Sequence, residues 1–427
     1  MSNDTIFALS SGRPPAAIAV IRISGPDAHA AGAALAGTLP PARHAAVREL
    51  RDDEGGLLDR ALILRFDGPH SATGEDSVEF HCHGGRSVTD AVIDALAKVH
   101  GVRPARPGEF TRRAFENGRI DLTEAEGLAD LIEAETESQR RAALATAEGG
   151  LRKQIEQWQH KFVELSARAE AAIDYVDEAE VADRGLVAGC ETLLADLSAW
   201  LGRPPAESLK DGIKVVIAGP PNAGKSSLLN AIVGSDKAIV TPIPGTTRDR
   251  IEVPLAIGGV PFVLTDTAGI RETVEPVERI GVAKAQQHIA GADILLWLGE
   301  PAEAPQHRAL IKVHARCDLG ERRIRPSGSL ATSTVTGAGL AELMSSIVEI
   351  AKTIVPFSDG AILLNRRQVE ALREATLARG RGTSASDDIV LLADGLRVAR
   401  QALDKLTGRA GVEDVLDALF SRFCLGK

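Results

Sequence analysis

Several kinds of residue and segment are scarce or missing in this sequence. Aromatic residues make up only 3% of the chain, and no apolar run of about 18 residues could span a bilayer. The N-terminal stretch lacks the basic and apolar regions of a signal peptide. We therefore expect a cytoplasmic protein with no membrane partner. The four cysteines are too widely spaced for a metal or disulfide motif, which excludes a disulfide-rich secreted protein: Cys82, Cys190, Cys317 and Cys424.

The balance of charge is acidic. Lysine and arginine number 49 and aspartate and glutamate 59, which gives a net charge of −10. Such a chain does not coat nucleic acid through bulk electrostatics. A local exception is the segment 103–119, which holds five arginines and two phenylalanines. This segment is either a solvated basic face or a binding surface, and the sequence favours neither.

The first half of the chain changes character near residue 119. Residues 1–118 mix short apolar strands, such as 17–21, with Gly/Pro turns and one helical pattern over 87–99, which predicts an α+β domain. Residues 119–210 are dominated by Glu, Ala, Gln and Leu. Between residues 151 and 172 apolar residues recur at spacings of three and four, which predicts one buried stripe on a long helix.

The second half returns first to an α/β pattern and then to helices. Residues 211–356 alternate strand and helix patterns, which is typical of a mostly parallel sheet covered by helices. Residues 357–427 are again helical. Because helical segments flank the α/β segment, we infer that it is inserted into one helical domain. The predicted fold is multidomain: an α+β N-terminal domain, an α-helical bundle and an inserted α/β domain.

A phosphate-binding loop stands at the start of the α/β segment. Residues 219–226 read G-P-P-N-A-G-K-S, which matches G-x-x-x-x-G-K-[ST]. The apolar run 213–218 precedes the loop and a helical pattern follows from Lys225, as this motif requires. Backbone N–H groups of such a loop hold the β-phosphate, the lysine neutralises β/γ oxygens, and the Ser226 hydroxyl binds Mg²⁺. The motif predicts a nucleoside triphosphate site.

Two further segments are typical of a nucleotide switch. Residues 266–269 read D-T-A-G after an apolar strand, where Asp266 can hold Mg²⁺ through water and the Gly269 amide can contact the γ-phosphate. Residues 243–249 read I-P-G-T-T-R-D, and we expect Thr247 to complete the Mg²⁺ shell. The alternative for this second segment is a Pro-Gly turn before a strand.

The expected base-binding strand end departs from the usual guanine motif. In place of Asn-Lys-x-Asp, residues 315–318 read A-R-C-D. Asp318 can accept from the guanine ring N–H and amine, and the stem of Arg316 can lie over the base, but Ala315 cannot hydrogen-bond as asparagine does. The pattern favours GTP over ATP, with reduced affinity or altered selectivity. Ser333 and Thr334 are expected to belong to a last loop that contacts the base. The expected nucleotide-binding residues are Asn222, Ala223, Gly224, Lys225, Ser226, Ser227, Thr241, Thr246, Thr247, Asp266, Thr267, Ala268, Gly269, Asp318, Ser333 and Thr334.

Motifs outside the α/β segment point to one family. Residues 18–26 read I-A-V-I-R-I-S-G-P, residues 79–85 read E-F-H-C-H-G-G, residues 107–119 contain P-G-E-F-T-R-R-A-F and N-G-R, and the chain ends in C-L-G-K. The segments G-P-P-N-A-G-K-S-S-L-L-N, P-G-T-T-R-D and D-T-A-G-I-R are similar to those of Era-like GTPases. Together, in this order and over essentially the whole chain, they resemble the MnmE (TrmE) family of tRNA uridine-modifying GTPases.

This resemblance implies a fold and a reaction. The fold would be an N-terminal folate-binding domain and a G domain inserted into a helical domain, with homodimers forming through the N-terminal domains. With an FAD-dependent partner, MnmG, the family modifies C5 of the wobble uridine in certain tRNAs. The bound cofactor would be a tetrahydrofolate, in the 5,10-methylene or (6S)-5-formyl form, and it would supply the one-carbon unit. Glycine or ammonium would supply the amine.

The resemblance also implies roles for single residues. An arginine can pair with a folate carboxylate and a glutamate can accept from the pterin; the matching folate positions are Arg22, Glu79, Arg119 and Lys427. Cys424 matches a tail cysteine required for modification, and Glu278 matches the residue that orients the attacking water. Instead of an arginine finger, a K⁺ ion would stimulate GTP hydrolysis when two G domains meet. The matching K⁺ positions are Asn222, Thr241, Ile243 and Thr246.

Three functions remain open at the level of sequence. The first is the GTP-hydrolysing component of a tRNA-modifying complex, and the second is a regulatory or ribosome-assembly GTPase of the Era-like branch. The third is a folate-binding module with a vestigial G domain, for which the only support is Ala315. The N-terminal motifs and the C-L-G-K tail favour the first.

Overall fold

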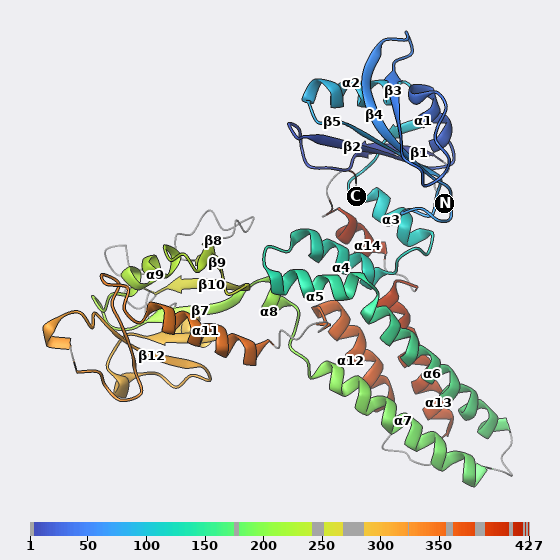
Figure 1. Cartoon of the computed structure of the whole chain (residues 1–427). Coiled ribbons are helices and arrows are strands. Elements are labelled where there is room, and N and C mark those ends of the chain that lie inside the picture. Colours follow the sequence, from blue (N-terminus) through green and yellow to red (C-terminus); the bar gives the residue numbers. More distant parts are fainter. Residues whose placement is uncertain are drawn as a thin grey trace, which may run out of the picture. The chain divides into compact units, whose positions relative to one another are not determined.

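The chain forms two compact units in the computed structural model. The N-terminal unit consists of residues 1–129 together with 401–427, and the central unit of residues 130–400. Figure 1 traces the chain from its blue N-terminal strands to its red C-terminal helices. The structure describes residues 4–174, 179–240, 252–267, 286–322, 324–355, 362–380, 389–409, 413–421, 423 and 426.

A six-stranded sheet forms the core of the N-terminal unit, in the order β3-β4-β5-β2-β1-β6. Its strand pairs are antiparallel except for β1 with β6. One face is buried under the helices α1 (Ala28–Ala36) and α2 (Arg86–Ala97), where Ile21, Ile63 and Phe80 join one core. The strands are β1 Thr5–Leu9, β2 Ile18–Ser24, β3 Ala46–Arg51, β4 Leu57–Phe66, β5 Ser77–His83 and β6 Val102–Pro104.

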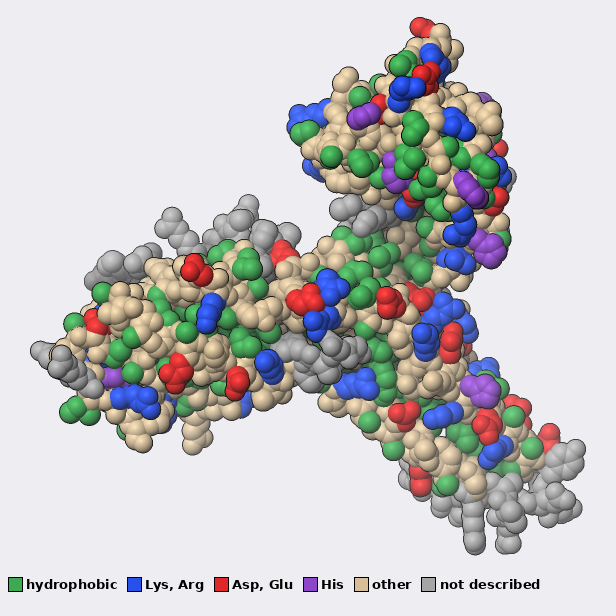
Figure 2. Space-filling model, in the orientation of Figure 1, with side chains coloured by type: hydrophobic (Ala, Val, Ile, Leu, Met, Phe, Trp, Pro, Cys, Tyr) green, Lys and Arg blue, Asp and Glu red, His purple; other side chains and the backbone are tan. Residues whose placement is uncertain are grey.

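The other face of this sheet carries exposed apolar side chains. Successive residues of a strand point to opposite faces, so the neighbours of buried residues lie on this face. Ile18, Val47 and Leu62 lie here, on three strands, with 57%, 60% and 37% of their surface exposed. We call it the open face. Over the visible surface of both units, Figure 2 shows acidic and basic side chains interspersed.

Three short helices complete the N-terminal unit: α3 (Glu109–Glu116), α4 (Leu122–Glu133) and α14 (Glu413–Phe420). Apolar residues of α4 and of the C-terminal segment share one cluster. Gly108, just before α3, has φ 69°, and a Cβ atom there would lie 2.2 Å from the carbonyl oxygen of Phe420. Only glycine fits such an approach, so α14 packs directly on the start of α3.

Arg113 lies on α3 with 3% of its side chain exposed, surrounded by carboxylates. It donates to Asp4 at 2.8 Å, to Glu75 at 3.2 Å and to Glu109 at 3.1 Å. Arg103 also pairs with Asp4 and Glu109, and Arg112 pairs with two further carboxylates. Three of the five arginines in 103–119 are therefore held in ion pairs within this unit, which favours a structural role over a nucleic-acid-binding surface for them.

This cluster predicts an acid dependence of stability. Burial raises the pKa of Glu109, but hydrogen bonds from Arg103, the Arg106 amide and Arg113 outweigh it and hold the pKa at about 2, against an ordinary 4.5. Because the pKa of Glu109 is lower in the folded state, its ionised carboxylate stabilises the fold above pH 4.5. This stabilisation is lost as the pH falls toward 2. In urea unfolding of the full chain, we expect stability to fall more steeply over this range than in Glu109→Gln. If the free energy of unfolding fell equally steeply with pH in both proteins, this role of the Glu109 carboxylate would be contradicted. Hydrogen exchange of the α3 amides measures the same effect locally.

A seven-stranded sheet lies in the central unit, in the order β13-β12-β11-β7-β10-β9-β8. The strands from β13 to β10 pair in parallel, and β9 and β8 extend the edge in antiparallel fashion. The predicted mostly parallel sheet is thus confirmed, and α9 (Lys225–Val233) and α11 (Leu340–Ile354) pack on it. The strands are β7 Ile213–Ala218, β8 Ala238–Val240, β9 Glu252–Ile257, β10 Val260–Asp266, β11 Ile294–Trp297, β12 Leu310–Ala315 and β13 Leu330–Thr332.

Long helices form the rest of the central unit. In Figure 1, α6 (Gly150–Asp174) and α7 (Ala179–Leu201) run side by side, and α7 contacts α12 (Arg366–Gly380); α13 (Ile389–Thr407) follows. Trp158 donates to Asp196 at 2.9 Å and meets Trp200 edge to face. Among the described helices, none is both long and apolar enough to cross a bilayer. The predicted stripe on α6 is buried: Leu151, Ile155, Trp158, Phe162, Leu165, Ala169 and Ala172.

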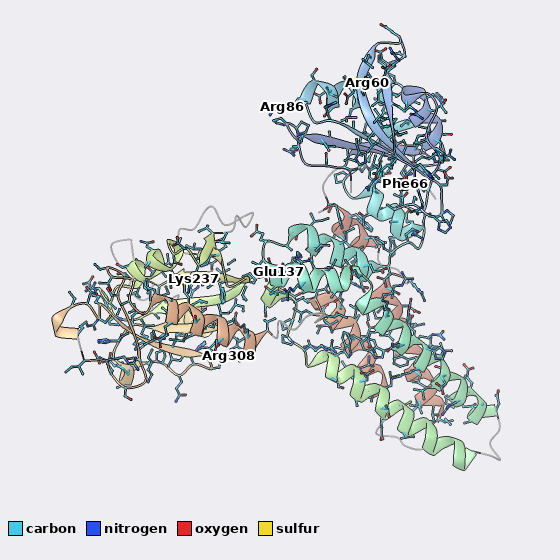
Figure 3. The ribbon with its side chains drawn as sticks, in the orientation of Figure 1. Arg60, Phe66, Arg86, Glu137, Lys237 and Arg308 are labelled. Carbon is cyan, nitrogen blue, oxygen red and sulfur yellow. The ribbon has the colours of Figure 1, made fainter. Side chains whose placement is uncertain are left out.

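The sheet of the central unit is tied to the start of α5 (Glu137–Ala147). Thr136 and Gln139 form a capping box at this helix end. The Ser138 hydroxyl donates to the carbonyl of Gly259, in the turn between β9 and β10, at 2.8 Å. Glu137, labelled in Figure 3, pairs with arginines of its own helix. The hairpin that leads into β10 therefore has a fixed anchor outside the sheet.

Candidate functional site

The phosphate-binding loop connects β7 to α9 as predicted. Gly219 and Gly224 have φ of 150° and 95°, and Asn222 also takes a positive φ of 59°. These conformations turn the loop so that its backbone N–H groups can surround an anion at the start of α9. Lys225, 6% exposed, donates its Nζ to the carbonyl oxygens of Gly219 and Pro220 at 3.0 and 2.8 Å. The ammonium thus lies within the loop, where triphosphate oxygens would be neutralised.

The structure brings two of the three predicted Mg²⁺ residues together. Asp266 ends β10, which pairs in parallel with β7, so its carboxylate lies beside the loop. The Ser226 hydroxyl donates directly to Asp266. Thr267 is held by a hydrogen bond from its hydroxyl to the carbonyl of Ile217 at 3.0 Å. A hydroxyl and a carboxylate are the oxygen ligands that Mg²⁺ prefers, so these two side chains fit the ion.

The base-binding segment follows β12. Arg316 takes a left-handed φ of 61°, and its Nε lies 3.6 Å from the place that a Cβ would take on Gly224. Asp318 is exposed. Ser333 is fully buried, and its Oγ accepts from the amides of Val335 and Thr336, which fixes the loop that also contains Thr334. Of these residues, Arg316 is the one that the structure places next to the phosphate-binding loop.

Several predicted residues lie outside the described part of the chain. They belong to the switch segments and to the C-terminal tail, and their predicted roles stay predictions. These residues are Thr241, Ile243, Thr246, Thr247, Ala268, Gly269, Glu278, Cys424 and Lys427.

In the N-terminal unit, two of the predicted folate residues form an ion pair. Arg22 on β2 and Glu79 on β5 are directly paired in register, and the guanidinium reaches the carboxylate at 2.9 Å from both Nε and Nη2. The Arg22 guanidinium also lies 5.7 Å from the ring centroid of Phe110. Arg119 lies beside Gly74 in the same unit. The pair offers a cation and a carboxylate to one ligand.

The C-terminal tail reaches the end of β1. The Ser10 hydroxyl donates to the carbonyl of Gly426 at 2.8 Å. Gly426 has φ 92°, and a Cβ atom there would lie 2.0 Å from the carbonyl oxygen of Leu9. The adjacent β2 carries Arg22, which pairs in register with Ala8. The tail therefore docks close to the strand that holds the ion pair.

Family comparisons agree with this geometry. The model for the N-terminus of the GTP-binding protein TrmE matches residues 5–119, and the model for the MnmE helical domain matches residues 122–424. A tRNA modification GTPase MnmE from Rhizorhabdus wittichii is 53% identical over 100% of this chain and 97% of its own length. The chain belongs to the MnmE family. A second MnmE, from Erythrobacter litoralis, is 50% identical over 99% of this chain and its full length.

Membership of the MnmE family confirms two predictions. The multidomain fold, with a TrmE-type N-terminal domain, a helical domain and a G domain, is that of the family. The chain is a GTPase, as its relatives' name states, and its phosphate-binding loop fits this activity. Among solved structures, the G domain of the T. maritima FeoB iron transporter matches 33% of this chain and 98% of its own, with 27% identity and a TM-score of 0.24; that score supports no further conclusion.

Sequence reasoning missed some contacts at both sites. His81 places its Nε2 3.3 Å from the second oxygen of Glu79. The alternation in E-F-H-C-H, with Glu79 and His81 two residues apart, could have put them on one sheet face. The contacts of Ser10 and of Phe110 carry no local signal, because they depend on segments far apart in sequence.

The Mg²⁺ site leads to a first functional prediction. Replacing Ser226 by alanine removes the hydroxyl next to Asp266, so we expect GTP hydrolysis to fall on the order of 100-fold. The matched control is Ser235→Ala, because the Ser235 hydroxyl bonds the carbonyl of Ile232 and the sulfur of Met344, near the far end of α9. Phosphate release at saturating Mg²⁺ measures both. Equal rates for the two variants would remove Ser226 from the site.

The docked C-terminal tail leads to a second functional prediction. Gly426→Ala cannot keep its contact with Leu9, so the tail should leave the end of β1 while the phosphate-binding loop stays intact. We expect faster proteolysis of the C-terminal residues and unchanged GTP hydrolysis. Gly37→Ala has a similar φ of 68° with open space around it, and controls for backbone strain alone. Equal protection of the tail in both variants would contradict the docking.

Proposed function

We propose that this chain is the GTP-hydrolysing component of a complex that modifies C5 of the tRNA wobble uridine. A tetrahydrofolate supplies the one-carbon unit, and an FAD-dependent partner, MnmG, completes the reaction. The observation that carries the proposal is the docking of Gly426 beside the strand of Arg22. Gly426 lies two residues after Cys424, and it docks in the unit that carries the proposed folate residues Arg22 and Glu79. A GTPase that only regulates assembly has no need of this arrangement.

The Arg22–Glu79 pair supports folate binding. In water-poor surroundings a guanidinium binds a carboxylate with two hydrogen bonds, and a carboxylate accepts from N–H groups of a pterin. Arg22 and Glu79 keep 26% and 15% of their side chains exposed, so a ligand can reach them. In the proposal Arg119 and Lys427 add positive charge, and bound folate supplies the one-carbon unit.

The open face supports a homodimer through the N-terminal domains. Exposed apolar side chains on a sheet face are typical of surfaces that meet a partner. Residues 1–118 form this domain in the proposal, followed by helical segments 119–210 and 357–427 around a G domain at 211–356. The site of action is the cytoplasm.

For GTP hydrolysis, we propose that Asn222 and the oxygen atoms of Thr241, Ile243 and Thr246 hold K⁺. Asn222 lies within the phosphate-binding loop and carries a side-chain oxygen, which supports this role. K⁺ supplies positive charge near the β- and γ-phosphates. Thr247 completes the Mg²⁺ shell, and Glu278 orients the attacking water through a bridging water.

Nucleoside analysis of tRNA tests the proposal. Cells that lack this chain should lose the modified wobble uridine, and the wild-type chain should restore it. Arg22→Ala should fail to restore it while keeping GTP hydrolysis. The matched control is Arg86→Ala, an exposed arginine labelled in Figure 3 at the start of α2, outside the open face. Normal modification in the deletion strain would disprove the function.

Exchange of the monovalent cation tests the K⁺ assignment. Na⁺ is smaller and fits the same oxygen atoms poorly, so we expect GTP hydrolysis to slow markedly when Na⁺ replaces K⁺ at equal ionic strength. Affinity for GDP serves as the control, because the ion acts on the γ-phosphate step. An unchanged rate in Na⁺ would remove Asn222 and its neighbours as K⁺ ligands.

A further inference from the structure

A buried hydroxyl without a partner lies next to the base-binding segment. Thr332 ends β13 and is 1% exposed, and its Oγ has no hydrogen-bond partner among the described residues. In the parallel pairing of β12 with β13, the residue directly across from it is Ala315, itself 5% exposed. Buried polar atoms are normally paired, because leaving one unpaired costs free energy. The methyl group of Ala315 therefore stands where a hydrogen-bonding side chain would satisfy Thr332.

The chemistry of guanine decides what this means for the nucleotide. One edge of the base presents the ring N–H and the amino group, both donors, and the other presents N7 and O6, both acceptors. The Asp318 carboxylate can only accept, so it matches the first edge. A side chain that reads N7 must carry a donor. Ala315 has none, and the Thr332 hydroxyl is too deeply buried to reach a ligand.

Arg316 supplies a contact of another kind. Its left-handed backbone turns the side chain toward the phosphate-binding loop, with Nε near Gly224, while the residue as a whole stays exposed. A planar guanidinium stacks on aromatic rings of any purine and does not distinguish N7 from carbon.

We propose that this chain leaves N7 of guanine unread, with Asp318 as the reader of the opposite edge, Arg316 as a stacking surface, and Ala315 as the specificity-determining position. This inference rests on GTP binding by the G domain. It does not depend on the proposed role in tRNA modification, so the failure of one leaves the other standing.

The test compares GDP with 7-deaza-GDP, in which carbon replaces N7, by titration calorimetry on the full chain. The wild-type chain should bind both with equal affinity within about 2-fold. Ala315→Asn gains a donor at N7 and should prefer GDP by about 2- to 12-fold, the range of one neutral hydrogen bond. Arg316→Ala should weaken both nucleotides by the same factor. A wild-type preference for GDP above this 2-fold limit overturns the proposal.

Thermal unfolding without nucleotide provides a second readout. The asparagine amide of Ala315→Asn gives the Thr332 hydroxyl a partner, so this variant should melt at or above the wild-type temperature. Thr332→Val removes the unpaired hydroxyl with little change in shape and should also melt no lower than wild type. A marked loss of stability in Thr332→Val would mean that the hydroxyl has a partner, and would overturn the inference at its origin.

Discussion

Arg113 holds three segments of the N-terminal unit together through carboxylates. Asp4 comes from the chain just before β1, Glu75 from the loop before β5, and Glu109 from the start of the same helix. Removing one partner of such a buried pair typically costs about 3–5 kcal/mol, because a charge is left uncompensated. The position of α3 follows from these bonds. That position sets the approach of Gly108 to Phe420, and with it the path of the C-terminal segment toward β1.

Two sites with different chemistry are built in different units of one chain. The nucleotide site uses a parallel sheet, whose strand ends place Asp266 beside the phosphate-binding loop. The Arg22–Glu79 site uses the pairing of antiparallel strands, which sets a cation opposite a carboxylate. Strand β10 belongs to the first site at one end, and at the other its hairpin is bonded to Ser138 of α5. The strand that ends in Asp266 is therefore bonded to the helices at the end opposite its carboxylate.

Much of this architecture follows from local sequence patterns. The stripe on α6 is predictable because, in a helix that buries one face, every third or fourth residue lies on that face. The phosphate-binding loop is predictable because its glycines, Lys225 and Ser226 act within eight consecutive residues. Cross-strand partners are different, since register depends on how distant segments align. The pairing of Arg22 with Glu79, and of Ala315 with Thr332, could not be read from either residue's surroundings. The same holds for Arg103 and Arg113, because their shared partner Asp4 stands near the start of the sequence.

The apolar contact between α4 and α14 has a consequence for synthesis of the chain. Leu122 and Ala125 share a cluster with Leu419 and Phe420, but the whole central unit, residues 130–400, is translated between them. At 5–20 residues per second the ribosome needs roughly 15–55 s for that stretch. During this time the apolar side of α4 has been made while its partner has not. The N-terminal unit is thus the first to begin synthesis and the last to be completed. Until the final residues of the chain emerge, the nascent chain must keep α4 from other contacts.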